Sequence, residues 1–77
     1  MARYYFDSHD GDRMIGDDVG IELDGIEAVK ALAARTLAEL AADVLPGATK
    51  RELWIEVRTA EGPVMTASMT FEAKLHG

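Results

Sequence analysis

The hydrophobic pattern of the chain changes its period twice, and this change is the strongest constraint on the fold. Between residues 24 and 46 the apolar side chains recur every three or four positions, at Ile26, Val29, Ala33, Leu37, Leu40 and Val44. This spacing is typical of a helix with one apolar face. We therefore predict an amphipathic helix of about 20 residues that ends at Pro46 and Gly47. Asp24 is its predicted N-cap, and Glu27 completes a capping box.

The segments on both sides of this helix alternate between apolar and polar residues, as strands do. Residues 3–8 are rich in aromatic side chains and lead to a turn at residues 10–12 and a short strand at 13–15. After a second irregular stretch, residues 21–23 form an extended segment that leads to the helix. After the helix, residues 53–58 and 64–72 alternate, with a turn at 61–63 between them. Within residues 53–58 the apolar face consists of Leu53, Ile55 and Val57. Both flanks therefore predict hairpins.

Together these elements predict a two-layer α+β fold of order β-β-α-β-β, in which one amphipathic helix packs on a mostly antiparallel sheet. Because the chain has 77 residues, we expect a single α+β domain over residues 1–77 with one modest core. A chain of this size has no room for the deep interdomain cleft that many enzymes use. The lack of cysteine excludes a disulfide framework and a thiolate metal site.

The net charge of −6 is located in one part of the chain. Residues 1–27 hold eight acidic and two basic residues, whereas residues 28–77 hold six of each. A negative field repels phosphate backbones, so the sequence argues against a nucleic-acid partner. No stretch approaches the roughly 18 apolar residues of a membrane span, and we expect a cytoplasmic protein without a membrane partner.

Three short motifs precede the predicted helix: R-Y-Y-F at residues 3–6, D-G at 10–11 and D-x-x-G-I-E-L at 17–23. Together with the alanine-rich helix and the hairpin that contains I-E-V-R at residues 55–58, this pattern resembles a domain-of-unknown-function family of short alphaproteobacterial proteins. The resemblance extends over nearly the whole chain. It implies one small domain and names no catalytic residue.

The acidic N-terminal segment is the candidate metal site, because hard cations take several oxygen ligands from one loop. The candidate ligands are Asp7, His9, Asp10, Asp12, Asp17 and Asp18. Their spacing does not fit a calcium loop, since counting from Asp10 places Met14 and Ile15 where an oxygen ligand and a glycine are required. The alternative is that Asp10 and Asp17 hydrogen-bond to the backbone of their own turns.

Catalysis has one candidate pair. His9 and Asp7 share a strand face, so Asp7 could orient His9 as a general base. Ser8 points to the opposite face, and no nucleophile or catalytic motif accompanies the pair. His76 lies one residue from the end of the sequence. We therefore predict no catalytic residue, no cofactor and no enzymatic activity.

The remaining candidate is a protein interface on the sheet face away from the helix. If Leu53, Ile55 and Val57 face the helix, alternation directs Trp54 outward. The predicted patch combines aromatic and hydroxyl side chains, namely Tyr5, Trp54, Thr66, Ser68 and Thr70. Such a composition favours an interaction module that forms homodimers or binds another protein. The alternative is an acidic ligand-binding protein, or an antitoxin-like one, that neutralises a basic partner or binds a divalent cation.

Overall fold

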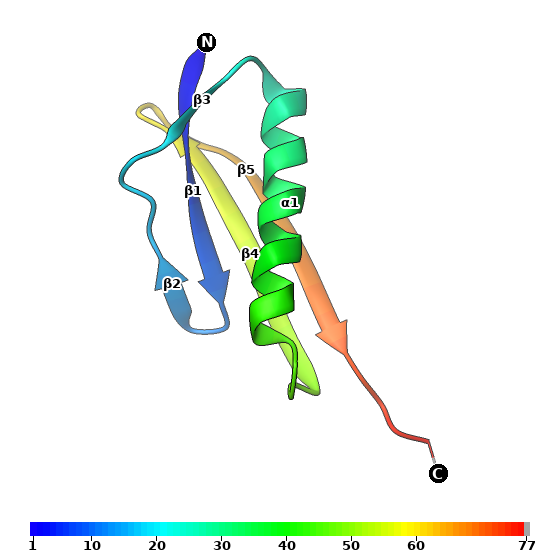
Figure 1. Cartoon of the computed structure of the whole chain (residues 1–77). Coiled ribbons are helices and arrows are strands. Elements are labelled where there is room, and N and C mark those ends of the chain that lie inside the picture. Colours follow the sequence, from blue (N-terminus) through cyan, green and yellow to red (C-terminus); the bar gives the residue numbers. More distant parts are fainter. Residues whose placement is uncertain (77) are drawn as a thin grey trace.

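Five strands and one helix follow one another along the chain, and the computed structural model describes residues 1–76 (Figure 1). The elements are β1 (Ala2–Asp10), β2 (Arg13–Ile15), β3 (Ile21–Leu23), α1 (Ile26–Val44), β4 (Lys50–Thr59) and β5 (Gly62–Glu72). The predicted α+β class is confirmed. The order differs by one element, because the extended segment at 21–23 pairs with β1 and forms a third strand before the helix.

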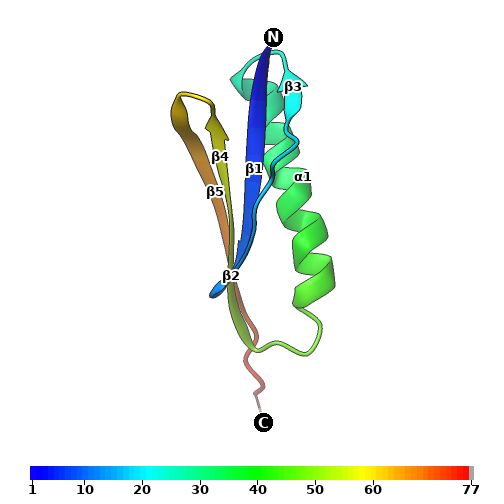
Figure 2. The same ribbon diagram turned by 90° about the vertical axis from the view of Figure 1, so that its left-hand side faces the viewer.

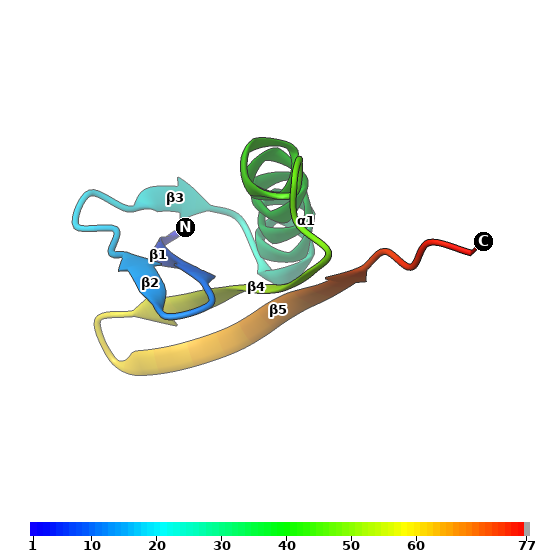
Figure 3. The same ribbon diagram turned by 90° about the horizontal axis from the view of Figure 1, so that it is seen from below.

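The sheet is antiparallel throughout, in the order β2-β1-β4-β5. The two short strands both pair with β1: β3 with residues 2–4 and β2 with residues 8–10. They therefore share one edge of the sheet, and β5 forms the other edge. Seen from below, α1 lies over β4 and β5, and β2 and β3 lie at the end of the sheet away from β5 (Figure 3).

The core forms between the helix and the central strand β4. Its buried side chains are those that the two hydrophobic periods predict: Val29, Ala33 and Leu37 from α1, and Leu53, Ile55 and Val57 from β4. Burial of each valine, leucine or isoleucine contributes roughly 1.5–3 kcal/mol. The partly buried apolar side chains around this core come from β1, β3, β5, the second half of α1 and Leu45 just after it. The helix thus covers one face of the sheet (Figure 2).

The predicted start of the helix is wrong in two details. The N-cap is Gly25 with φ of 107°, and no side chain caps the helix, so Asp24 does not form the predicted capping box. Ile26 is 47% exposed, because the buried part of the helix begins only at Val29. The predicted end is confirmed: the N–H of Leu45 donates to the carbonyl of Ala41, and a turn follows.

The helix α1 is not long and apolar enough to cross a membrane.

Candidate functional site

The sheet face opposite α1 carries the predicted aromatic side chains. The register pairs Tyr5 with Arg58 and His9 with Trp54 across β1 and β4, and it pairs Trp54 with Ser68 across β4 and β5. The β4 residues that alternate with Trp54 and Arg58, namely Leu53, Ile55 and Val57, are buried under the helix. Trp54, and Tyr5 opposite Arg58, therefore point outward, as the alternation predicts. Both are partly buried, whereas the predicted β5 positions Thr66, Ser68 and Thr70 are exposed. We call the side chains of Tyr5, Trp54, Thr66, Ser68 and Thr70 the outer patch.

His9 covers one side of Trp54 in the outer patch. The two rings are stacked, with centroids 4.6 Å apart and planes inclined by 7°. The imidazole Nε2 lies 2.6 Å from Oε1 of Glu56, and the His9 side chain is 17% exposed. Its observed carboxylate partner is Glu56 and not Asp7, which corrects the proposed His9–Asp7 pair. The indole ring packs against an imidazole that also contacts the Glu56 carboxylate, so this side of Trp54 is covered.

Arg58 ties Asp7 to the loop between β2 and β3. Its Nε donates to Asp7 Oδ2 at 2.9 Å, and its Nη2 donates to the carbonyl of Asp17 at 2.8 Å. The guanidinium carbon lies 4.7 Å from the ring centroid of Tyr5, a cation–π arrangement. The hydrogen bond from Arg58 is the main cause that lowers the pKa of Asp7, and the same bond raises that of Arg58.

Asp17 closes a gap in the edge that β2 and β3 share. Because β3 pairs with residues 2–4 and β2 with residues 8–10, the N–H of Phe6 faces no strand. Asp17 Oδ2 accepts this N–H at 3.0 Å, and Oδ1 accepts those of Val19 and Gly20, each at 3.0 Å. Burial alone would raise the pKa of Asp17, but these three backbone donors bring it below its ordinary value. The predicted turn-bonding role of Asp17 is confirmed.

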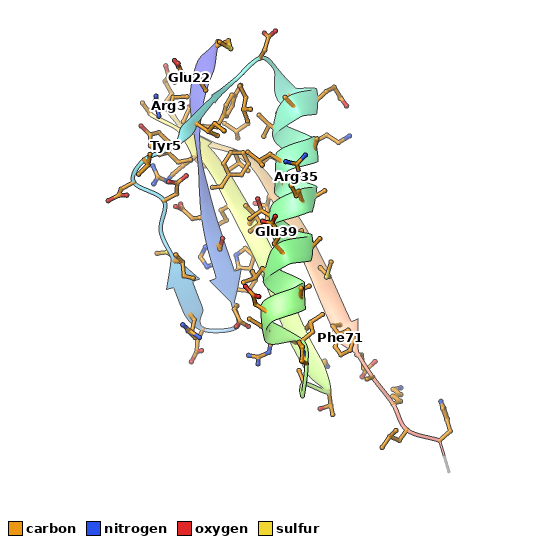
Figure 4. The ribbon with its side chains drawn as sticks, in the orientation of Figure 1. Arg3, Tyr5, Glu22, Arg35, Glu39 and Phe71 are labelled. Atoms are coloured by element: carbon orange, nitrogen blue, oxygen red, sulfur yellow. The ribbon has the colours of Figure 1, made fainter. Side chains whose placement is uncertain are left out.

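Gly20 allows this loop to lie against β1. Its φ is 75°, and a Cβ added there would lie 2.9 Å from Cε2 of Tyr5 and 3.0 Å from the carbonyl oxygen of Tyr4. Only glycine fits such a position without a shift of its neighbours. The side chains of Arg3 and Tyr5 lie beside this loop in Figure 4, and Arg3 donates to the carbonyl of Val19 at 2.7 Å. The D-x-x-G motif is thus the closure of a sheet edge.

The six candidate metal ligands do not converge on one point. Asp10 is buried and pairs with Arg51 at 3.1 Å, so its predicted turn-bonding role is wrong. Asp12 and Asp18 are exposed, while Asp7, His9 and Asp17 hold the partners described above. Within residues 1–76, no group of three or more His, Cys, Asp or Glu side chains is placed to hold a metal ion. His76 is exposed and lies after the end of β5.

A small cavity that no sequence pattern indicates lies between the β1–β2 hairpin and the C-terminal half of α1. It measures about 170 Å³, and its lining includes Ser8, Ile15, Leu40 and Val44, with Arg13 and Asp43 as charged neighbours of opposite sign. This volume lies below the roughly 300–1,000 Å³ of typical ligand sites. The sequence around Ser8 does not predict this cavity, because the cavity depends on where the helix packs relative to the hairpin.

Comparison with known proteins gives a family and no relative of known role. The family described as "Domain of unknown function (DUF6894)" matches residues 3–70. No curated protein and no solved structure matches the chain. The match confirms the predicted resemblance to a domain-of-unknown-function family, and the outer patch and its polar neighbours lie within the matched residues.

Proposed function

We propose a role for this chain, which belongs to the DUF6894 family of domains of unknown function: it is a non-enzymatic protein-interaction module that self-associates. The observation that carries the proposal is the layering of the fold. Within residues 1–76 the helix covers one face of the sheet, and the opposite face exposes the hydroxyl residues of β5 beside Trp54. Aromatic side chains with a polar surround are typical of interface centres.

The polar neighbours of the outer patch support an interaction role over catalysis. The imidazole of His9 is held between Trp54 and Glu56, and the carboxylate of Asp7 is held by Arg58. These pairings fix the shape of the face before a partner arrives, which lowers the entropy cost of binding. A small core also gains stability when a second copy covers exposed surface.

Sedimentation equilibrium tests self-association directly. We expect a reversible dimer between about 1 and 100 μM, with a dissociation constant in that range. Because apolar contacts and backbone hydrogen bonds would hold it, the dimer should change little between about 50 and 500 mM NaCl. A wild-type chain that is monomeric at the highest concentration contradicts the proposal.

The same salt series separates this function from the acidic alternative. Asp7, Asp10 and Asp17 are used inside the fold, so fewer of the N-terminal acids remain available to a basic partner. The exposed ones are Asp12, Asp18, Glu22, Asp24 and Glu27. A monomer that captures a basic protein at low salt and releases it at moderate salt would support the alternative instead. A cytoplasmic location is part of the proposal, and fractionation of host cells tests it.

A further inference from the structure

We propose that the second copy docks on the free edge of β5, so that two β5 strands pair antiparallel about a two-fold axis at Ser68. This inference rests on the proposed self-association and adds where and how the two chains meet. A strand at the edge of a sheet presents unpaired N–H and C=O groups that another strand can complete. β5 is 11 residues long, and no charged side chain lies between Gly62 and Phe71.

The hydrogen-bonding phase of β5 shows which backbone groups face the free edge. The N–H of Ala73 donates to the carbonyl of Thr49, and in an antiparallel ladder every second residue bonds to the same neighbour. The odd-numbered residues 65–71 therefore direct their backbone groups toward β4. The backbone groups of Thr66, Ser68 and Thr70 point away from β4, to the free edge. These three residues also supply the hydroxyl side chains of the outer patch.

Two features set the register at Ser68. A bulge in the β4–β5 pairing leaves Val64 as the extra residue, and Pro63 before it has no N–H to donate. At the other end Glu72 is the first charged residue of β5. The regular, uncharged segment is therefore 65–71, and its centre is Ser68. A two-fold axis at this residue pairs the segment with itself over its full length and keeps Pro63 outside the regular segment.

The side chains match across this axis on both faces. On the outer face Thr66 lies opposite Thr70 of the second copy, and the two Ser68 residues lie opposite each other. Hydroxyl pairs of this kind stabilise neighbouring strands. On the helix face Ala67 lies opposite Met69 of the second copy, and Met65 opposite its Phe71. Each cross-strand pair thus joins hydroxyl with hydroxyl or apolar with apolar, and none joins two charges of the same sign.

The fold leaves room for this arrangement. An axis perpendicular to the sheet places both helices on the same face, each above its own β4 and β5. Asp43 lies on the flank of α1 that faces the β1–β2 hairpin. Helical spacing places Ala34 and Ala38 on the opposite flank, and both are exposed. Glu27 and Lys30 lie on the same flank nearer the start of the helix, so a second helix can approach along the short side chains of Ala34 and Ala38.

A charge exchange at the two-fold axis tests the register. Ser68→Lys and Ser68→Glu should each weaken the dimer at least about tenfold, because like charges then lie directly opposite. A mixture of the two variants should recover a one-to-one dimer. Ala42→Lys is the control, since Ala42 is exposed on the helix, and it should leave the dimer unchanged. Circular dichroism checks that each variant folds.

Amide exchange in the wild-type chain tests the same contact without a substitution. The N–H groups of Thr66, Ser68 and Thr70 should exchange slowly at high protein concentration and quickly on dilution. Those of Ala67 and Met69, which face β4, should stay protected at both concentrations. A wild-type monomer overturns self-association itself. A dimer that tolerates both Ser68 variants and is lost in Trp54→Ala overturns only the edge pairing, because the outer patch then forms the contact.

Discussion

The two edges of the sheet are built in opposite ways. The edge formed by β2 and β3 consists of two three-residue strands, and side chains fill the gap between them. The β5 edge is one strand of 11 residues with a single bulge near its start. Short strands, charged side chains and covered backbone groups are the usual means by which proteins prevent edge-to-edge pairing. The first edge has these features, whereas the regular part of β5 has none of them.

The edge formed by β2 and β3, which we call the closed edge, depends on a small set of residues that contribute little to the core. Asp17 supplies the acceptors, Gly20 lets the loop approach β1, and Arg58 joins the loop to Asp7. Two acids of the N-terminal segment, Asp7 and Asp17, thus serve to close this edge of the sheet. Substitutions in this set should therefore lower stability, whereas substitutions at the β5 edge should alter association.

The largest effect is expected when the closed edge is forced open sterically. Gly20→Ala places a Cβ against the Tyr5 ring and the Tyr4 carbonyl in a backbone conformation that alanine rarely adopts. Strain and overpacking together should lower the free energy of unfolding by about 3 kcal/mol, measured by urea unfolding. Gly11→Ala is the matched control, because Gly11 also has positive φ but has no atom within 4 Å of the added Cβ. Equal losses in both variants would contradict the close approach of the loop.

Removing the acceptors of the closed edge should have the next largest effect. Asp17→Ala leaves the N–H of Phe6 without its acceptor and breaks the bonds to Val19 and Gly20. We expect a loss of about 2 kcal/mol in the free energy of unfolding, because a partly buried donor stays unsatisfied. Asp18→Ala, at the exposed neighbouring position, should change it by less than about 0.5 kcal/mol. A similar result for the two variants would mean that the gap needs no side-chain acceptor.

The local patterns of the sequence predict the helix, the strands β1, β2, β4 and β5, and the core. The apolar faces of α1 and β4 follow from hydrophobic periods of 3.6 and 2 residues. The turns at residues 10–12 and 61–63 follow from their glycines, which adopt positive φ at little cost. The sequence predicts only an extended segment at 21–23 and no strand, because no short turn joins it to a partner and its pairing with residues 2–4 is long-range. Strand order was not predictable, since it depends on contacts between segments that lie far apart in the sequence.

The candidate site was predictable only in part, for the same reason. The outward direction of Trp54 follows from its buried neighbours Leu53 and Ile55, and the turn role of Asp17 follows from the D-x-x-G spacing. The charged partners of Asp7, His9 and Asp10 are all on β4. Only the register between β1 and β4 identifies them, and no local pattern encodes it. The free edge of β5 is also not predictable from local patterns, because they do not show whether β5 is an inner or an edge strand.

The smallest effect concerns the ion pair that joins the closed edge to β4, and it is visible in the pH dependence of stability. Mainly because Arg58 donates to its carboxylate, the pKa of Asp7 is lower in the folded chain than its ordinary value of 3.8. A carboxyl with a lowered pKa stabilises the fold above its unfolded value, and this contribution is lost as the pH falls through the folded value. Stability should therefore decline from just above pH 4 downward.

Arg58→Gln removes the main cause, so its loss of stability between neutral and acidic pH should be smaller than in the wild type. The difference should be small, because Arg58 is exposed enough for solvent to screen the pair. Urea midpoints measured across this range test the expectation, and Arg13→Gln, which removes an exposed arginine of the closed edge, should keep the wild-type profile. An Arg58→Gln profile that follows the wild type would contradict Arg58 as the main cause of the lowered pKa of Asp7.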